Sequence, residues 1–98
     1  MPDDAESRKL LVLSRDALPE LNALVTSLAG LRIEGVRELA VDFSEVSLLS
    51  SALLGQLVRL HFGTQREGMV LKLLGLSVDM RRTLGISGIG GLLGIKPA

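Results

Sequence analysis

Short apolar runs alternate with amphipathic segments along this chain, and that alternation constrains the fold more than any other feature. Residues 10–13, 36–43, 69–74 and 92–95 have the length and apolar content of strands. Leucine and valine recur at helical spacing in the segments between them. Strands separated by helices predict crossover connections and a mostly parallel sheet. We therefore predict an α/β fold of about four strands in the order β-α-β-α-β-α-β, with the continuous run 69–74 as a central strand buried on both faces.

Each amphipathic segment carries the signals of a helix start and a helix stop. The expected helices cover residues 18–28, about 51–67 and 78–84. Their expected capping residues are Asp16, one of Ser50 and Ser51, and Ser77, and their expected stops are Gly30, Gly68 and Gly85. Gly63 lies inside the longest helix, where it costs about 1 kcal/mol relative to alanine.

The length of 98 residues allows one domain with one core. We assign residues 9–98 to this domain and residues 1–8 to a disordered N-terminal tail. The first residues are acidic and polar, unlike a secretory signal, and no apolar stretch reaches the roughly 20 residues of a membrane-spanning helix. We expect a cytoplasmic protein that does not insert into a membrane.

The composition argues against several classes of function. Eleven basic residues balance eleven acidic ones, and there are two Phe with no Tyr or Trp, so neither a basic nor an aromatic surface for nucleic acid is expected. There is no cysteine and only one histidine, His61, which we place at the edge of the core. Ser51 and His61 would lie about 15 Å apart along one helix, too far for proton transfer. We expect no metal, no cofactor and no enzymatic activity.

Ser50 and Ser51 are the residues with the most functional interest, because they precede the longest helix. One of them is expected to cap that helix by accepting a backbone N–H. Alternatively, one of them is a phosphoacceptor, since a phosphate at a helix N-terminus meets free N–H groups and the positive end of the helix dipole. Asp42, at a strand end, is either a carboxylate beside Ser51 or an ordinary cap of a turn.

Residues 41–55 (Val-Asp-Phe-Ser-Glu-Val-Ser-Leu-Leu-Ser-Ser-Ala-Leu-Leu-Gly) resemble the signature of the STAS domain family. In that signature, a hydrophobic strand ending in Asp-hydrophobic-Ser leads into a helix that begins Asp-Ser-x-x-Leu-Gly. Ser51 matches the family's phosphorylatable Ser/Thr, Leu54 and Gly55 match its Leu-Gly, and Ser50 stands where the family has Asp. Residues 66–71 and 77–89 also resemble the family's following segments, so that the resemblance covers roughly residues 10–95.

The resemblance implies an anti-sigma factor antagonist, a protein-interaction module of transcription regulation. Its partner would be an anti-sigma factor with serine kinase activity, which would bind the unphosphorylated form and transfer phosphate from its own ATP to Ser51. The partner-binding residues carried over from the family are Asp42, Ser50, Ser51, Ala52, Leu54 and Gly55.

Two further expectations stand beside this one. The chain could instead be a STAS adaptor that is not phosphorylated, docked permanently on a larger assembly such as an ABC-type transporter. The family's additional N-terminal strand and final helix have no counterpart in this sequence, which leaves a strand edge and the apolar residues Leu92, Leu93 and Ile95 to be covered. We therefore expect a symmetric homodimer.

Overall fold

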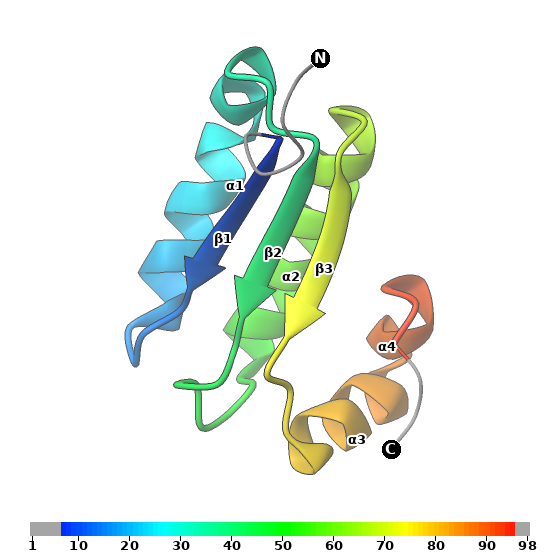
Figure 1. Cartoon of the computed structure of the whole chain (residues 1–98). Helices are drawn as coiled ribbons and strands as arrows, with labels where there is room; N and C mark the ends of the chain where they lie inside the picture. Colours follow the sequence, from blue (N-terminus) through cyan, green and yellow to red (C-terminus); the bar gives the residue numbers. More distant parts are fainter. Residues whose placement is uncertain (1–6, 96–98) are drawn as a thin grey trace.

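Three parallel strands form one sheet in the order β1-β2-β3, shown in Figure 1. The computed structural model describes residues 7–95 of the chain. The strands are β1 (Arg8–Val12), β2 (Glu38–Asp42) and β3 (Val70–Leu74), and both strand pairs are parallel. The predicted α/β class with crossover helices is confirmed, but the sheet has three strands in the described part of the chain instead of about four. β1 begins at Arg8, one residue before the predicted start of the domain, and Ser7 forms a turn; residues 1–6 of the predicted tail lie outside the described residues.

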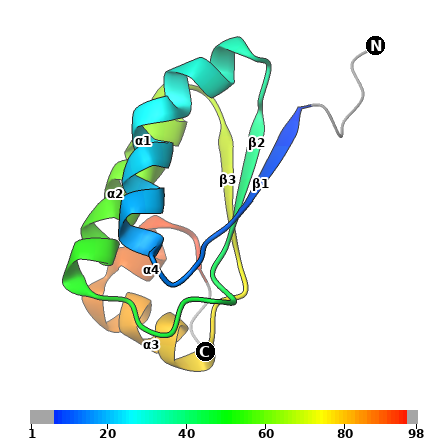
Figure 2. The same ribbon diagram turned by 90° about the vertical axis from the view of Figure 1, so that its left-hand side faces the viewer.

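Both crossover helices lie on the same face of the sheet (Figure 2). Helix α1 (Ala17–Ile33) connects β1 to β2, and helix α2 (Ser51–Arg66) connects β2 to β3. Because the chain adds each strand on the same side of the previous one, two right-handed crossovers place both helices on one face. The other face of the sheet carries no helix in residues 7–95, and we call it the open face.

Helix α1 is longer than its sequence signals predicted. Gly30 lies inside the helix, so the stop predicted there is wrong; the chain leaves the helix after Glu34, at Gly35, whose φ of 98° suits glycine. One glycine costs too little to end a helix that packs along its whole length. Asp16 occupies the N-cap position, but its side chain makes no capping hydrogen bond.

Helix α2 follows its prediction closely. It ends before Gly68, whose φ is 69°. Gly63 inside it has a packing role, because a Cβ atom there would lie 2.5 Å from Leu28 Cδ1 of α1. The glycine lets α1 and α2 approach closely over the sheet.

The core lies between the sheet and these two helices. Leu39, Val41 and Phe43 point toward the helices and are completely buried. The helices contribute leucines from both sides of their contact, namely Leu21, Leu24, Leu28, Leu53, Leu57 and Leu60. Strand β2 therefore holds the centre of the core.

The open face carries the alternate residues of each strand. Leu10 and Val12 of β1 and Val70 and Leu74 of β3 are exposed there. Between the two outer strands, Glu38 is 3.2 Å from the Arg8 side chain and 3.1 Å from Lys72 Nζ. The prediction that 69–74 is a central strand buried on both faces is wrong, because β3 is an edge strand with one face open.

The chain ends in two short helices, α3 (Val78–Ser87) and α4 (Ile89–Leu92). Ser77 caps α3 as predicted, with its Oγ accepting the Met80 N–H at 3.1 Å. The helix continues through the predicted stop Gly85 and ends at Gly88, which has a φ of 81°. The predicted strand 92–95 is wrong, since α4 occupies its start.

Leu93 and Ile95 pack partly against the core, and Leu92 is more exposed. The end of the described chain thus covers part of its own apolar surface. The expected homodimer stays a prediction. No helix within residues 7–95 has the length and apolar character needed to cross a membrane.

Candidate functional site

The segment that joins β2 to α2 brings the sequence-predicted site residues to one end of the molecule. We call residues 42–55 the α2 entrance. Parallel strands all end at this edge of the sheet, which is where α/β proteins commonly bind ligands and partners. Val46 and Leu49 anchor the connecting loop in the core, while Leu48 between them is 72% exposed. The loop therefore presents an apolar side chain to solvent next to the start of the helix.

Ser50 is the residue that caps α2. Its backbone is extended, and its Oγ accepts the Leu53 N–H at 3.1 Å. Ser51 is the first residue of the helix, is exposed, and its hydroxyl makes no hydrogen bond within the part of the chain described. The capping role that the sequence left open for the serine pair thus belongs to Ser50, and the phosphoacceptor role stays a prediction.

The Ser51 hydroxyl is set in favourable electrostatics for a phosphate. The first turn of α2 contains no acidic residue. Its first backbone N–H groups have no partner within the helix and carry the positive end of the helix dipole. A phosphoryl group on Ser51 would therefore be tolerated by the free protein and would change the surface charge by nearly two units.

Asp42 serves the turn that follows β2. Its Oδ1 accepts the Ser44 N–H at 2.8 Å and lies against Gly75 in the turn after β3. No hydrogen bond connects it to Ser51. Of the two roles predicted for Asp42, the structure places its side chain in the turn-capping one.

Ala52 and Gly55 line a groove between α1 and α2. The groove has a volume of about 550 Å³ and is also lined by Leu18, Pro19, Asn22, Gln56 and Arg59. Ser50 lines a separate, smaller hollow of about 280 Å³, to which Leu18 and Leu48 contribute apolar walls. Leu54 is different, because it is half-buried and packs against the core. The entrance therefore offers a shallow, partly apolar surface around Ser51, to which Leu54 contributes support from beneath.

Sequence reasoning missed three residues of this surface: Leu18, Leu48 and Gln56. Leu18 is an apolar residue at the start of the predicted helix 18–28, where burial is expected, yet it is 39% exposed. The Gln56 Oε1 atom is buried and has no hydrogen-bond partner among residues 7–95. An unpaired buried acceptor is costly. No pattern in the sequence marks these positions, because exposure depends on how α1 and the loop pack together.

His61 lies at the edge of the core as predicted. It is half-buried on α2, and its ring meets that of Phe62 edge-on, with 5.2 Å between centroids. No group of three or more His, Asp or Glu residues in the described part of the chain could hold a metal ion.

Comparison of the chain with known proteins gave no match, whether with family models, with curated proteins or with solved structures. The support for a function therefore comes from the geometry of the α2 entrance and from the resemblance of residues 41–55 to a family signature.

Proposed function

We propose that this chain is a protein-interaction module of the STAS type that acts as an anti-sigma factor antagonist. In its unphosphorylated form it binds an anti-sigma factor with serine kinase activity through the α2 entrance. Phosphorylation of Ser51 then ends the interaction. The nucleotide belongs to the partner, and this chain supplies the hydroxyl and the docking surface.

The proposal rests on one observation: of the two adjacent serines, Ser50 caps the helix and Ser51 does not. Ser50 accepts the capping hydrogen bond, whereas Ser51 is exposed and its hydroxyl has no hydrogen-bond partner among the described residues. A kinase must surround the acceptor hydroxyl and align it with the γ-phosphate, so an exposed residue at a helix start is a suitable substrate. The family residue at position 50 is Asp, and Ser and Asp are both good N-caps. The departure at Ser50 therefore keeps the capping chemistry.

The surroundings of Ser51 suit a surface that binds a partner and can then be switched off. The exposed apolar side chains Leu48 and Leu18 line the hollow at the neighbouring Ser50, and the next residue, Ala52, lines the groove with Gly55. A partner that covers these groups desolvates Ser51 as well. A phosphate placed there would lose its hydration without gaining a counter-charge, and this cost would dissociate the complex.

Phosphorylation by a cell extract of the source organism tests the acceptor assignment. The chain is incubated with radiolabelled ATP and extract, and the labelled peptide is mapped. We expect label on wild type and on Ser50→Ala, and none on Ser51→Ala. Label that persists in Ser51→Ala would overturn the assignment of the acceptor.

The switch itself is tested with a phosphate mimic. Once the partner is isolated, Ser51→Asp should weaken binding at least tenfold, about 1.4 kcal/mol, while the circular dichroism spectrum stays unchanged. Ser51→Thr is the matched control and should bind as wild type does. Equal affinities for the Asp and Thr variants would remove the switch.

A second candidate function is the adaptor that is not phosphorylated, and the open face of the sheet favours it. Leu10 and Val70 are 57% and 56% exposed there. Exposed apolar side chains on a sheet face that no helix covers in the described residues can serve as part of an interface with another protein. The adaptor predicts that Leu10→Asp abolishes assembly and that Ser51→Asp does not, which is the reverse of the outcome expected for the switch.

A further inference from the structure

The outer edge of β3 has unpaired backbone groups. The Val70 N–H donates to Arg37 O and the Leu74 carbonyl accepts from Phe43 N, both at 2.8 Å. In a parallel ladder, these two bonds imply that the N–H and C=O groups of Val70, Lys72 and Leu74 all point toward β2. The corresponding groups of Leu71 and Leu73 therefore point away from the sheet, and they make no hydrogen bond within residues 7–95.

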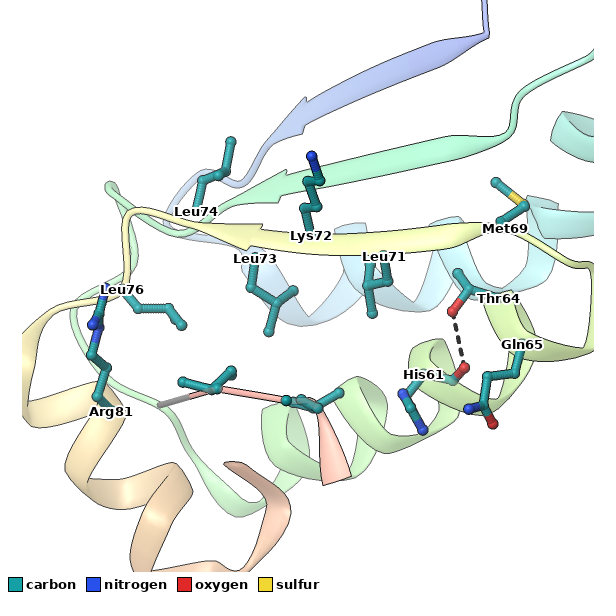
Figure 3. A pocket seen from close by; sticks show the side chains of 13 residues that line it. His61, Thr64, Gln65, Met69, Leu71, Lys72, Leu73, Leu74, Leu76 and Arg81 are labelled. Atoms are coloured by element: carbon teal, nitrogen blue, oxygen red, sulfur yellow. Dashed lines mark hydrogen bonds between the residues drawn. The ribbon is translucent and has the colours of Figure 1, made fainter. Parts of the chain in front are cut away.

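A groove runs along this same edge. Its volume is about 530 Å³, and it is bounded by β3, by His61 and Gln65 of α2 and by the segment 93–95. Figure 3 shows Leu71 and Leu73 pointing into the groove, while Lys72 points to the opposite side of the strand. Unpaired backbone groups and a groove that can take alternate side chains are the two requirements for binding an extended peptide as an additional strand.

The charges at this edge are positive. Arg81 lines the groove, is exposed and makes no ion pair within the described part of the chain. No Asp or Glu is among the groove's lining residues. On the open face, Glu38 is shared by two cations, Arg8 and Lys72.

The positive charge of Lys72 also disfavours pairing with a second copy of the chain. In the antiparallel register that pairs Leu71 of one copy with Leu73 of the other, Lys72 lies directly opposite Lys72 of that copy. Like charges directly opposite are destabilising, and a lysine on an edge strand is a common protection against self-pairing. A strand with a carboxylate at the facing position has the opposite preference.

We propose that the β3 edge binds an extended segment of a partner protein in which aliphatic side chains flank an acidic one. The aliphatic side chains enter the groove beside Leu71 and Leu73, and the carboxylate pairs with Lys72 on the open face. The backbone of the segment takes up the free N–H and C=O groups of Leu71 and Leu73. This surface is separate from the α2 entrance and does not depend on Ser51.

A synthetic peptide provides the test with the full chain. The probe is acetyl-Ser-Thr-Val-Glu-Val-Thr-Ser-amide, and the matched control has Lys in place of Glu. In an NMR titration at low salt, we expect the amide signals of Leu71 and Leu73 to shift and their hydrogen exchange to slow. The Glu peptide should bind about fivefold more tightly than the Lys peptide. Methylation of the backbone nitrogens of both valines should abolish binding, since it removes the peptide's donors.

The variant Lys72→Glu should reverse the preference between the two peptides. Thermal unfolding checks that this variant folds, and Lys72→Gln, which should bind both peptides equally, takes its place if it does not. The proposal is overturned by an absence of shifts at millimolar peptide, or by equal binding of both peptides to wild type. It is also overturned if the Leu71 and Leu73 amides are already protected in the protein alone. Protection that rises with protein concentration would identify a second copy as the occupant instead.

Discussion

The two faces of the sheet use the same kinds of side chain for different purposes. Toward the helices, Leu39 and Val41 are completely buried, whereas on the open face Leu10 is 57% exposed although it lies one strand away. Burial of apolar surface contributes roughly 25 cal/mol per Å². The helix side therefore supplies most of the stability of the domain, and the open face is left available for contacts. Leu39 therefore contributes to the stability of the fold, whereas Leu10 on the neighbouring strand remains available for contacts with other molecules.

The largest effect should come from a matched pair of truncations on the two faces. Leu39→Ala should lower the free energy of unfolding by about 2–5 kcal/mol, because it leaves a cavity in the core. Leu10→Ala should cost less than about 1 kcal/mol, because half of its side chain is already in water. Urea unfolding followed by circular dichroism measures both. Equal losses would mean that the open face is covered in solution.

A pair of glycine substitutions compares the turn after β3 with the outer surface of the helix layer. Gly75 has a φ of 69°, and a Cβ there would collide with Asp42 Oδ1 and lie 2.8 Å from Ser44 N. Gly75→Ala should therefore destabilise the protein by about 1–3 kcal/mol. Gly30→Ala, inside α1 with nothing within 4 Å of its added Cβ, should stabilise it by about 0.5–1 kcal/mol. Melting temperatures that move in the same direction would contradict this assignment.

Alanine substitutions of the two serines test which of them caps α2. Ser50→Ala removes the cap and should cost about 1 kcal/mol. Ser51→Ala removes a hydroxyl that bonds to nothing in the described residues and should change stability by less than about 0.5 kcal/mol. Thermal unfolding of both variants distinguishes them. A larger loss for Ser51→Ala would show that the cap has been assigned to the wrong serine.

The smallest effect is expected on the open face. Glu38→Gln removes both ion pairs of that face and should cost about 0.5–1 kcal/mol at low ionic strength. Because partly exposed ion pairs are screened, the difference between variant and wild type should shrink as salt is added. Chemical denaturation in urea at two salt concentrations measures this. A loss that is independent of salt would point to packing of the Glu38 side chain as the cause.

The sequence predicted those features that depend on local chemistry. The bounds of α2 and the Ser77 cap were readable, because amphipathic spacing and capping residues act within a turn or two. The helix stop predicted at Gly30 was wrong, because a glycine inside a helix and a glycine that ends one differ only in backbone conformation, which tertiary packing decides. The strand predicted at 92–95 was wrong for a similar reason, because a short apolar run fits a strand and a helix equally well.

The candidate site was predictable in its location and not in its detail. The pair Ser50 and Ser51 was identified as the helix start, but two adjacent serines fit the cap equally well until the backbone is known. The exposure of Leu48 and the free edge of β3 depend on which elements pack against them. A continuous apolar run such as 69–74 predicts a central strand, but the sequence alone does not say whether both faces of that strand are covered.

The place of β2 between two parallel partners has a consequence for how the molecule opens. Each neighbouring strand is joined to β2 through an entire helix, so no hairpin can form early and hold part of the sheet by itself. Either outer strand can separate while the remaining pair stays closed, but losing β2 dissolves both ladders at once. Amide hydrogen exchange should accordingly be slowest in β2, near the free energy of global unfolding, and faster in β1 and β3, which can open in smaller units.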